Sequence, residues 1–343
     1  MATQGQVTAD PGAVAVHLSS RNLAAVFALI FTAPFVAEFL LGDLTIKAIA
    51  ALVVMAPMYG GGALLIREIS RRRGLGWRGI LILGAAYTLI EEGFTTMSLF
   101  NPDYLKLHMH LLDHAWIPML GIGAWWTLFM FNLHTFWSIS VSVALIEGIF
   151  PEWADRPWLG RLGDAAIGAL FVLGCVIGTA ITLKMDPWKA PPVKLIVTTL
   201  LVLIVVLVAL RRPRSSNSHQ AGDVPSPWVT AAVTFVLGLG VMFIPNTWNW
   251  GAFAAMVAID FIFLALLTVF SSRESWTKLH TLSLAAAGAC AYGLHAFTQQ
   301  PVYGGTGAIA RISNAIFLGT ALILVAVGAA RTARVARHHT DSA

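Results

Sequence analysis

The chain has 343 residues, of which 57% are hydrophobic and 11% are charged, and its mean hydropathy is +0.75. Ordinary soluble domains carry about 25% charged residues, so this composition excludes a soluble protein and predicts an all-α, polytopic integral membrane protein of the cell membrane. The net charge of +5 is no sign of nucleic acid binding, because arginine clusters in membrane proteins usually mark the cytoplasmic ends of helices. The expected partner is the lipid bilayer.

Ten apolar runs of about 20 residues follow one another along the chain, and each is long enough for a transmembrane helix. They cover residues 22–41, 46–66, 77–98, 122–148, 164–183, 193–210, 228–245, 249–270, 278–297 and 312–330. With the N-terminus inside, sixteen of the 22 lysines and arginines fall in inner segments, as the positive-inside rule requires. We therefore predict ten helices with both termini in the cytoplasm.

Polar segments divide the chain into five predicted parts. They are a cytoplasmic tail (1–21), a six-helix membrane region (22–210), a cytoplasmic linker (211–227), a four-helix membrane region (228–330) and a basic cytoplasmic tail (331–343). The linker combines charge, serine and proline, which is typical of a flexible connection. No internal repeat is apparent, although the glycine-rich residues 57–65 are a candidate break in the second span, as in many transporters.

The third span carries two adjacent glutamates, Glu91 and Glu92, within LIEEGFTTMSLFNPDY. They lie about 21 Å from the inner end of the helix, at 1.5 Å per residue, and an ionisable residue at such a depth is a functional candidate by default. Two neighbouring carboxylates in a dry site cannot both ionise easily, so we expect one to hold a proton while the other accepts one. Thr88 and Thr95 share their helix face, with Tyr87 beside it, and these three residues are predicted to contact a substrate.

The outer segment that follows, NPDYLKLHMHLLDHAWIPML, is rich in histidine. It contains His108, His110, Asp113 and His114. On a helix, His110 and His114 would share one face, as a zinc-binding pair does. The HxHxxDH spacing is one residue longer than the HxHxDH of metallo-beta-lactamase-like hydrolases, so we interpret the segment as an amphipathic interfacial one and expect no metal site. No cofactor follows from the sequence.

The fourth span carries His134 near its middle, with Trp137 at i+3 and Ser138 at i+4. These residues form a second polar stripe, in which Trp137 and Ser138 are further candidates for substrate contact. Sequential helices usually pack as neighbours, so we expect this stripe to face the two glutamates. A satisfied polar seam between two helices is the non-catalytic alternative.

Other polar residues within the spans are few. Asp260 lies near the centre of the eighth span, where it needs a partner, and His295 ends the ninth span, with Gln299 at i+4. Both Asp260 and His295 are candidate catalytic residues. Glu38, Glu68 and Glu147 lie near helix ends, where solvation is cheaper, and are interpreted as structural.

The acidic pair and the histidines resemble motifs of the CPBP family, the CAAX-processing and bacteriocin-processing intramembrane proteases, which are also labelled abortive-infection proteins. Glu91 and Glu92 match the acidic pair of the EExxxR motif, His134 stands at the histidine of FxxxH, and His295 at that of HxxxN. The resemblance implies that a glutamate and the histidines activate water to cut a peptide bond within the membrane. The chain departs from the motifs at Thr96, Met130 and Gln299.

Three functions are consistent with these residues. The leading hypothesis is an intramembrane hydrolase in which Glu91 or Glu92 acts as a general base toward water and His134 orients that water or stabilises the oxyanion. Its substrate would be a hydrophobic peptide or a prenyl-type molecule. The first alternative is a membrane-integral terpene cyclase, whose acids protonate an alkene or epoxide and whose aromatic side chains stabilise carbocations. The second is a proton-coupled transporter.

Overall fold

The computed structural model describes residues 20–211 and 220–340, and 76% of the structure is helical. Most of the predicted tail 1–21, residues 212–219 of the linker and residues 341–343 lie outside the described residues. The α-helices are α1 (Ser20–Pro34), α2 (Ala51–Arg72), α3 (Gly76–Ile90), α4 (Ala124–Asn132), α5 (Ser142–Ile149), α6 (Arg161–Met185), α7 (Pro192–Arg211), α8 (Pro227–Phe243), α9 (Trp250–Ser271), α10 (Lys278–His295) and α11 (Ala308–Thr340).

Short segments complete the secondary structure. Three are π-helical, η1 (Phe35–Leu40), η3 (Glu91–Thr95) and η5 (Leu133–Val141). The 3-10 turns are η2 (Ile46–Ala48), η4 (Tyr104–Lys106), η6 (Pro151–Trp153), η7 (Asn246–Trp248) and η8 (Ala296–Thr298), and the strands are β1 (Trp116–Ile117) and β2 (Ile122–Gly123). Because η1 extends α1, η3 extends α3, and η5 joins α4 to α5, the described residues form ten helical rods, each overlapping one predicted span.

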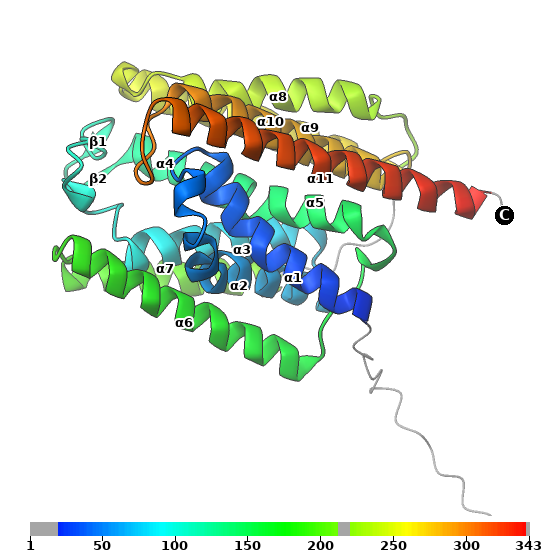
Figure 1. Ribbon diagram of the computed structural model, residues 1–343, viewed down its shortest axis with the longest axis horizontal. Helices are drawn as coiled ribbons and strands as arrows, with labels where there is room; N and C mark the ends of the chain where they lie inside the picture. The colour runs from blue at the N-terminus through cyan, green and yellow to red at the C-terminus, as the bar shows by residue number, and fades with distance from the viewer. Residues whose placement is uncertain (1–19, 212–219, 341–343) are drawn as a thin grey trace, which may run out of the picture.

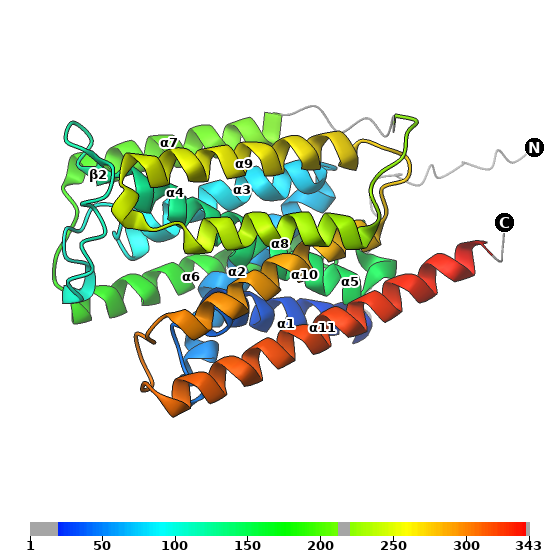
Figure 2. The ribbon, with the colours of Figure 1, turned by 90° about the horizontal axis from the view of Figure 1, so that it is seen from above.

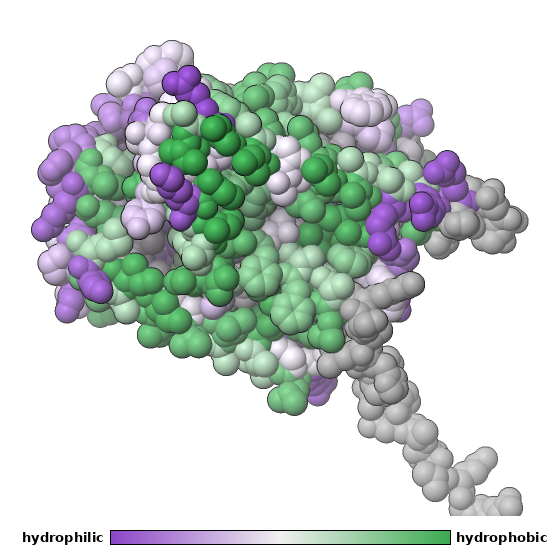
Figure 3. All heavy atoms as spheres, viewed as in Figure 1, coloured by the Kyte–Doolittle hydropathy of each residue, from purple (hydrophilic) through white to green (hydrophobic). Residues whose placement is uncertain are grey.

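The chain is a multi-pass, all-α membrane protein. Seven of the described helices are long and apolar enough to cross a membrane, whereas α8, with 17 residues, is shorter. The rods run side by side between two ends of the bundle (Figure 1). We call one the hairpin end, where β1 and β2 lie, and the other the basic end, where α1 begins and α11 ends. Hydrophilic residues gather at both ends and apolar residues cover most of the surface between them (Figure 3).

Helix α2 is continuous through its proline and glycines, so the expected break at residues 57–65 is wrong. The glycines serve close packing instead. A Cβ atom at Gly60 would lie 2.1 Å from the carbonyl oxygen of Ile30 on α1, and one at Gly62 would lie 2.5 Å from the ring of Tyr87 on α3. The absence of side chains at these two positions therefore lets α1 and α3 approach α2 closely.

A buried ion network holds the basic end together. The Arg67 guanidinium is fully buried; it donates to Glu147 at 3.0 Å and to Glu68 at 2.5 Å, and its carbon lies 3.4 Å from the centre of the Trp158 ring. The backbone N–H of Trp158 donates in turn to Glu68, at 2.9 Å. Since every charge in this network is paired, it fits a structural role that ties α2 to the segment between α5 and α6.

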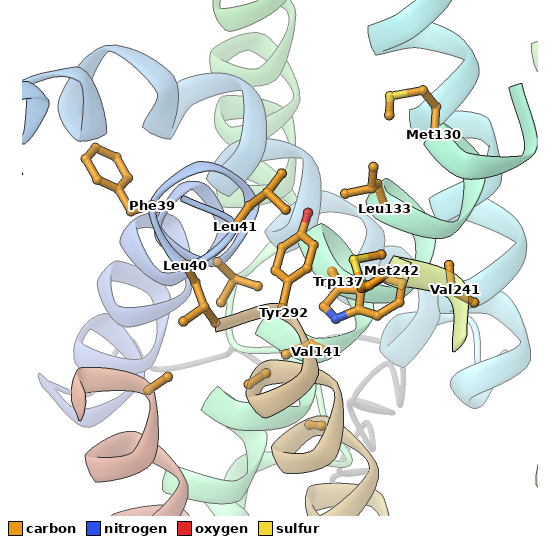
Figure 4. Packing of buried hydrophobic residues seen from close by; sticks show 14 of the residues in the cluster. Phe39, Leu40, Leu41, Met130, Leu133, Trp137, Val141, Val241, Met242 and Tyr292 are labelled. Carbon is orange, nitrogen blue, oxygen red and sulfur yellow. The ribbon is translucent and has the colours of Figure 1, made fainter. Parts of the chain in front are cut away.

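The last helices pack directly on the first ones. Trp137 of η5 stacks on Tyr292 of α10, with ring centres 5.2 Å apart, and its indole N–H donates to the carbonyl oxygen of Gly288 at 2.8 Å. Figure 4 shows the Tyr292 ring between Trp137 and Leu41. The predicted basic tail begins as a helix, because α11 continues to Thr340 and Arg331 lies 3.5 Å from Glu152.

The histidine-rich outer segment contains no α-helix, so His110 and His114 do not share a helical face. It consists of turns and irregular residues, the single turn η4 and the strand β1, which pairs with β2 just beyond the segment. His108 pairs with Asp103 at 3.0 Å, His110 pairs with Asp113 at 3.1 Å, and His114 packs against Trp125. Each histidine therefore has a different neighbour, and they do not converge on one point.

Candidate functional site

The described π-helical segments all contribute to one polar centre. Glu38 lies in η1, Glu91 and Glu92 open η3, and His134 lies in η5. A π-helical turn contains an extra residue and often marks a functional site. The wider spacing is visible in the hydrogen bonds, because the N–H of Thr96 donates to the carbonyl oxygen of Glu91, five residues earlier, at 2.9 Å. The three segments therefore depart from α-helical geometry where the polar side chains meet.

His134 lies between the two glutamates. Its Nε2 atom is 2.8 Å from Oε1 of Glu92, and its Nδ1 atom is 3.1 Å from Oε2 of Glu91 and 3.3 Å from the hydroxyl oxygen of Ser138. Side-chain exposure is 8% for His134, 1% for Glu91 and 6% for Glu92. One imidazole thus bridges two consecutive carboxylates in an environment that largely excludes bulk water.

The two carboxylates differ in how firmly they are held. Oε2 of Glu92 accepts hydrogen bonds from the hydroxyls of Thr96, at 2.9 Å, and Ser98, and the Ser98 hydroxyl also accepts from the indole N–H of Trp126 at 3.1 Å. Oε2 of Glu91 makes no hydrogen bond of good geometry within the described residues. Glu92 is therefore the more firmly anchored carboxylate, and Oε2 of Glu91, 3.1 Å from His134 Nδ1, is the less firmly held oxygen.

Two tyrosines and a third glutamate border the centre. The rings of Tyr59 and Tyr87 lie 6.2 and 6.0 Å from the His134 ring, and their hydroxyls lie beside Glu91. The Tyr59 hydroxyl donates to Oε1 of Glu38 at 2.5 Å. Sequence alone indicates a structural role for Glu38 and does not single out Tyr59. Glu38 is followed by only three residues of its apolar run, so its position gives little sign of a functional role.

Polar residues of two outer segments lie close to the same acids. Asp43 follows η1, and its carboxylate accepts a hydrogen bond from the side chain of Gln299 at 2.8 Å. Burial, together with the charge of Glu38, raises the pKa of Asp43 to about 8. Burial and the charges of Glu92, Glu38 and Glu91 raise the pKa of the Tyr104 phenol above its ordinary value. Both residues therefore link the hairpin end electrostatically to the centre.

The centre can hold either a proton or a cation. Glu91, Glu92 and His134 each offer one ligand atom, and these three atoms lie within 4.8 Å of one another. Carboxylate and imidazole ligands suit several divalent metals. In their present arrangement the same atoms already contact one another, which favours exchange of a proton between imidazole and carboxylate.

The structure separates the other predicted site residues from this centre. His295 packs edge-on against Phe243, at 5.2 Å between ring centres, and does not join the glutamates as the resemblance implied. Asp260 instead accepts a hydrogen bond from the Asn132 side chain at 3.0 Å. Trp137 packs on Tyr292 as described above. Of the predicted substrate contacts, Tyr87 and Ser138 lie at the centre.

The two threonines predicted to contact a substrate are buried among helices. The Thr88 hydroxyl donates to the carbonyl oxygen of Gly84 at 3.1 Å and lies 3.5 Å from the hydroxyl of Thr135. Thr95 has an exposed fraction of 1%, and its hydroxyl makes no hydrogen bond within the described residues. Thr88 therefore contributes to the contact between α3 and η5, beside the centre rather than within it.

Fold and site together define a multi-pass membrane protein with a buried carboxylate–histidine centre in its helical bundle. The family model described as "Uncharacterized membrane protein family" matches residues 27–337, so the chain belongs to this family. The match spans all three π-helical segments. The CPBP family model does not match, and the resemblance to those proteases has no support from the comparisons. No curated protein and no solved structure matches the chain.

Proposed function

We propose that this membrane protein is an intramembrane hydrolase that uses Glu91, Glu92 and His134 to activate water. The observation that supports this proposal best is the position of His134 between two consecutive buried carboxylates. General acid–base catalysis commonly uses buried carboxylates and a histidine that lie within hydrogen-bonding distance of one another. A purely structural seam would be expected to satisfy both carboxylates, whereas one oxygen of Glu91 has no hydrogen bond of good geometry within the described residues.

The proposed roles follow from the hydrogen bonds. Glu91 is the general base, because its Oε2 lies 3.1 Å from His134 Nδ1 and makes no hydrogen bond of good geometry within the described residues. It takes a proton from water, the water oxygen forms a bond to the substrate carbonyl carbon, and the bond from that carbon to the leaving group breaks. The proton passes from Glu91 to the leaving group. His134 stabilises the negative charge on the carbonyl oxygen, and Glu92 keeps the imidazole oriented.

The position of the centre favours an apolar substrate. Glu91 and Glu92 follow the 15 residues of α3, so they lie about 22 Å along the rod from its beginning at the basic end. The carbonyl bond to be hydrolysed would have to reach this depth, which suits a hydrophobic peptide or a prenyl-type ester in the bilayer.

Incorporation of heavy oxygen tests the proposal for any substrate whose hydrolysis creates a carboxylate. The full chain is reconstituted into bacterial inner-membrane vesicles in water labelled with oxygen-18, and mass spectrometry follows label entering carboxylates of peptides and lipids. We expect the wild type to label at least one class of product and the variants Glu91→Gln and His134→Gln to lose that labelling.

Glu152→Gln, at the basic end, is the matched control and should label as the wild type does. Labelling by the Glu91→Gln/Glu92→Gln double variant at the wild-type rate would rule out the proposal, as would no labelling above that of empty vesicles.

The cyclase alternative would use a different acid. Asp260 lines an aromatic cavity that does not include Glu91 or Glu92 in its wall. A cyclase would therefore lose activity on Asp260→Asn and keep it on Glu91→Gln, which is opposite to the hydrolase expectation.

A further inference from the structure

A second feature of the bundle is a cavity of about 720 Å³ between α3, η5, α8, α9 and α10. Its size is within the range of small-molecule sites, about 300–1,000 Å³. The walls are mainly apolar and aromatic. They include Phe136, Trp137, Leu237, Phe263, Leu267 and Leu284. The cavity is separate from the carboxylate–histidine centre, none of whose acids or histidine lines it.

The loose packing of α9 leaves this space open. Only two residues of α9, Ala252 and Met256, are buried, and both lie near the beginning of the helix. There α9 contacts α4 and α8, and Figure 2 shows α8 and α9 side by side. Farther along, Phe263 packs edge-on against Phe136, with ring centres 5.3 Å apart. The second half of α9 otherwise forms one wall of the cavity.

The mouth of the cavity lies at the basic end and carries three cations. Arg71, Arg78 and Lys278 line it together with Asp155. Arg71 is paired with Glu147 at 2.5 Å, and Lys278 with Asp155 at 2.6 Å. Arg78 is exposed and has no acidic partner among the described residues. The mouth therefore has an uncompensated positive charge at the basic end of the bundle.

The end of the cavity farthest from the mouth is polar. Asp260 and Asn132 are joined there by a hydrogen bond of 3.0 Å, and the side-chain oxygen of Asn132, a residue with an exposed fraction of 2%, has no hydrogen bond within the described residues. Asp260 and Ser271 both line the cavity, and the helix between them is about 17 Å long. An apolar chain entering from the mouth meets this polar pair at that depth.

We propose that the cavity binds a single-chain lipid with a phosphate headgroup. The apolar walls hold the chain, Arg78 at the mouth binds the phosphate, and the Asp260–Asn132 pair limits how far the chain can enter. The phosphate suits Arg78 because a guanidinium forms directional, charge-assisted hydrogen bonds to phosphate oxygens. A lipid with one chain fits a cavity of this size better than a two-chain phospholipid, and it can enter from the adjacent leaflet.

Native mass spectrometry of the full chain in detergent micelles tests this site. The probes are oleoyl lysophosphatidate, monoolein, which has the same chain and no charge, and glycerol phosphate, which has the headgroup and no chain. We expect lysophosphatidate to bind at least about tenfold more tightly than either of the others, since a factor of ten corresponds to about one charge-assisted hydrogen bond.

Variants separate the headgroup contact from the chain contact. Arg78→Gln should weaken lysophosphatidate binding about tenfold and leave monoolein unchanged, whereas Arg73→Gln, at the exposed C-terminal end of α2, should change neither. Leu237→Trp should weaken both lipids because it fills the cavity, and thermal unfolding in detergent checks that this variant folds. Wild-type affinity for lysophosphatidate in both Arg78→Gln and folded Leu237→Trp would overturn the proposal. So would tight binding of glycerol phosphate alone, which would indicate a phosphate site without a lipid.

Discussion

Glu92 and His134 are 42 positions apart in the sequence, yet Oε1 of the first lies 2.8 Å from Nε2 of the second. Removing either partner leaves a buried polar group of the other residue unsatisfied, which costs more than removing both. We therefore expect the destabilisation by Glu92→Gln and by His134→Gln to be non-additive, with a coupling energy of about 1–3 kcal/mol. Chemical unfolding of the single and double variants in detergent measures it. Glu92→Gln combined with Arg73→Gln, which are not in contact, should be additive, and additivity in the first pair would contradict a direct interaction.

Arg67 is expected to be the most sensitive charged residue at the basic end. Arg67→Met leaves the buried Glu68 with backbone donors and the more distant Arg72, at 3.9 Å, and takes one of two arginines from Glu147. Breaking a buried ion pair from one side typically costs about 3–5 kcal/mol, so the variant should unfold at much lower denaturant concentration. Arg73→Met, at an exposed position just after the end of α2, is the control and should be within about 0.5 kcal/mol of the wild type. Equal stability of the two variants would mean that the network contributes little.

Gly62 tests the close approach of α2 to the centre. A Cβ atom there would lie 2.5 Å from the Tyr87 ring, which borders His134. Gly62→Ala should therefore destabilise the protein by about 1–3 kcal/mol, the usual cost of overpacking. The matched control is Gly168→Ala on α6, where a Cβ atom meets nothing within 4 Å and a small gain in stability is expected. Thermal unfolding of the two variants in the same detergent gives the comparison, and a neutral Gly62→Ala would show that the ring moves aside freely.

Asp43 should make stability depend on pH. Its pKa is raised to about 8 by burial and by the charge of Glu38, against about 3.9 in an unfolded chain. The folded state therefore binds this proton more tightly, so its contribution to stability is complete below about pH 4 and is lost as pH rises toward 8. Asp43→Asn keeps an oxygen acceptor for Gln299 and removes the titration. Melting temperatures between about pH 5 and pH 9 should fall less steeply for this variant than for the wild type, and parallel curves would exclude Asp43 as the titrating group.

The sequence predicts most of the helices and the meeting of Glu91, Glu92 and His134 for one physical reason, which is that polar residues are rare inside membrane helices. Glu91, Glu92 and His134 stood out on that ground, and the packing of neighbouring spans correctly suggested that they face each other. Asp260 also stood out, but a charge in an apolar helix does not reveal which of several neighbouring helices supplies its partner. Asn132 is that partner, and a neutral asparagine within a span gives little sequence signal.

The remaining parts depended on local geometry that residue patterns do not encode. The π-helical turns have no distinctive amino-acid composition, so the sequence predicts regular helices there. For the same reason it places Glu38 near a helix end and gives no sign that Glu38 faces the centre. His295 followed a motif spacing, but its direction is set by how α10 packs, which turns it toward Phe243. In the outer segment, His108 and His110 occupy left-handed backbone conformations, with φ of 52° and 51°, and such residues interrupt the helix that their spacing suggested.

The three π-helical turns make the site sensitive to changes in chain length. Each turn contains one residue more than an α-helical turn, so removing a single residue within Leu133–Val141 restores a regular helix and rotates everything beyond it relative to His134. The difference between a bundle of regular helices and one with π-helical turns at this centre thus amounts to a one-residue insertion in each turn. Relatives without the glutamates or the histidine are therefore expected to show one-residue gaps at these turns when their sequences are aligned with this one.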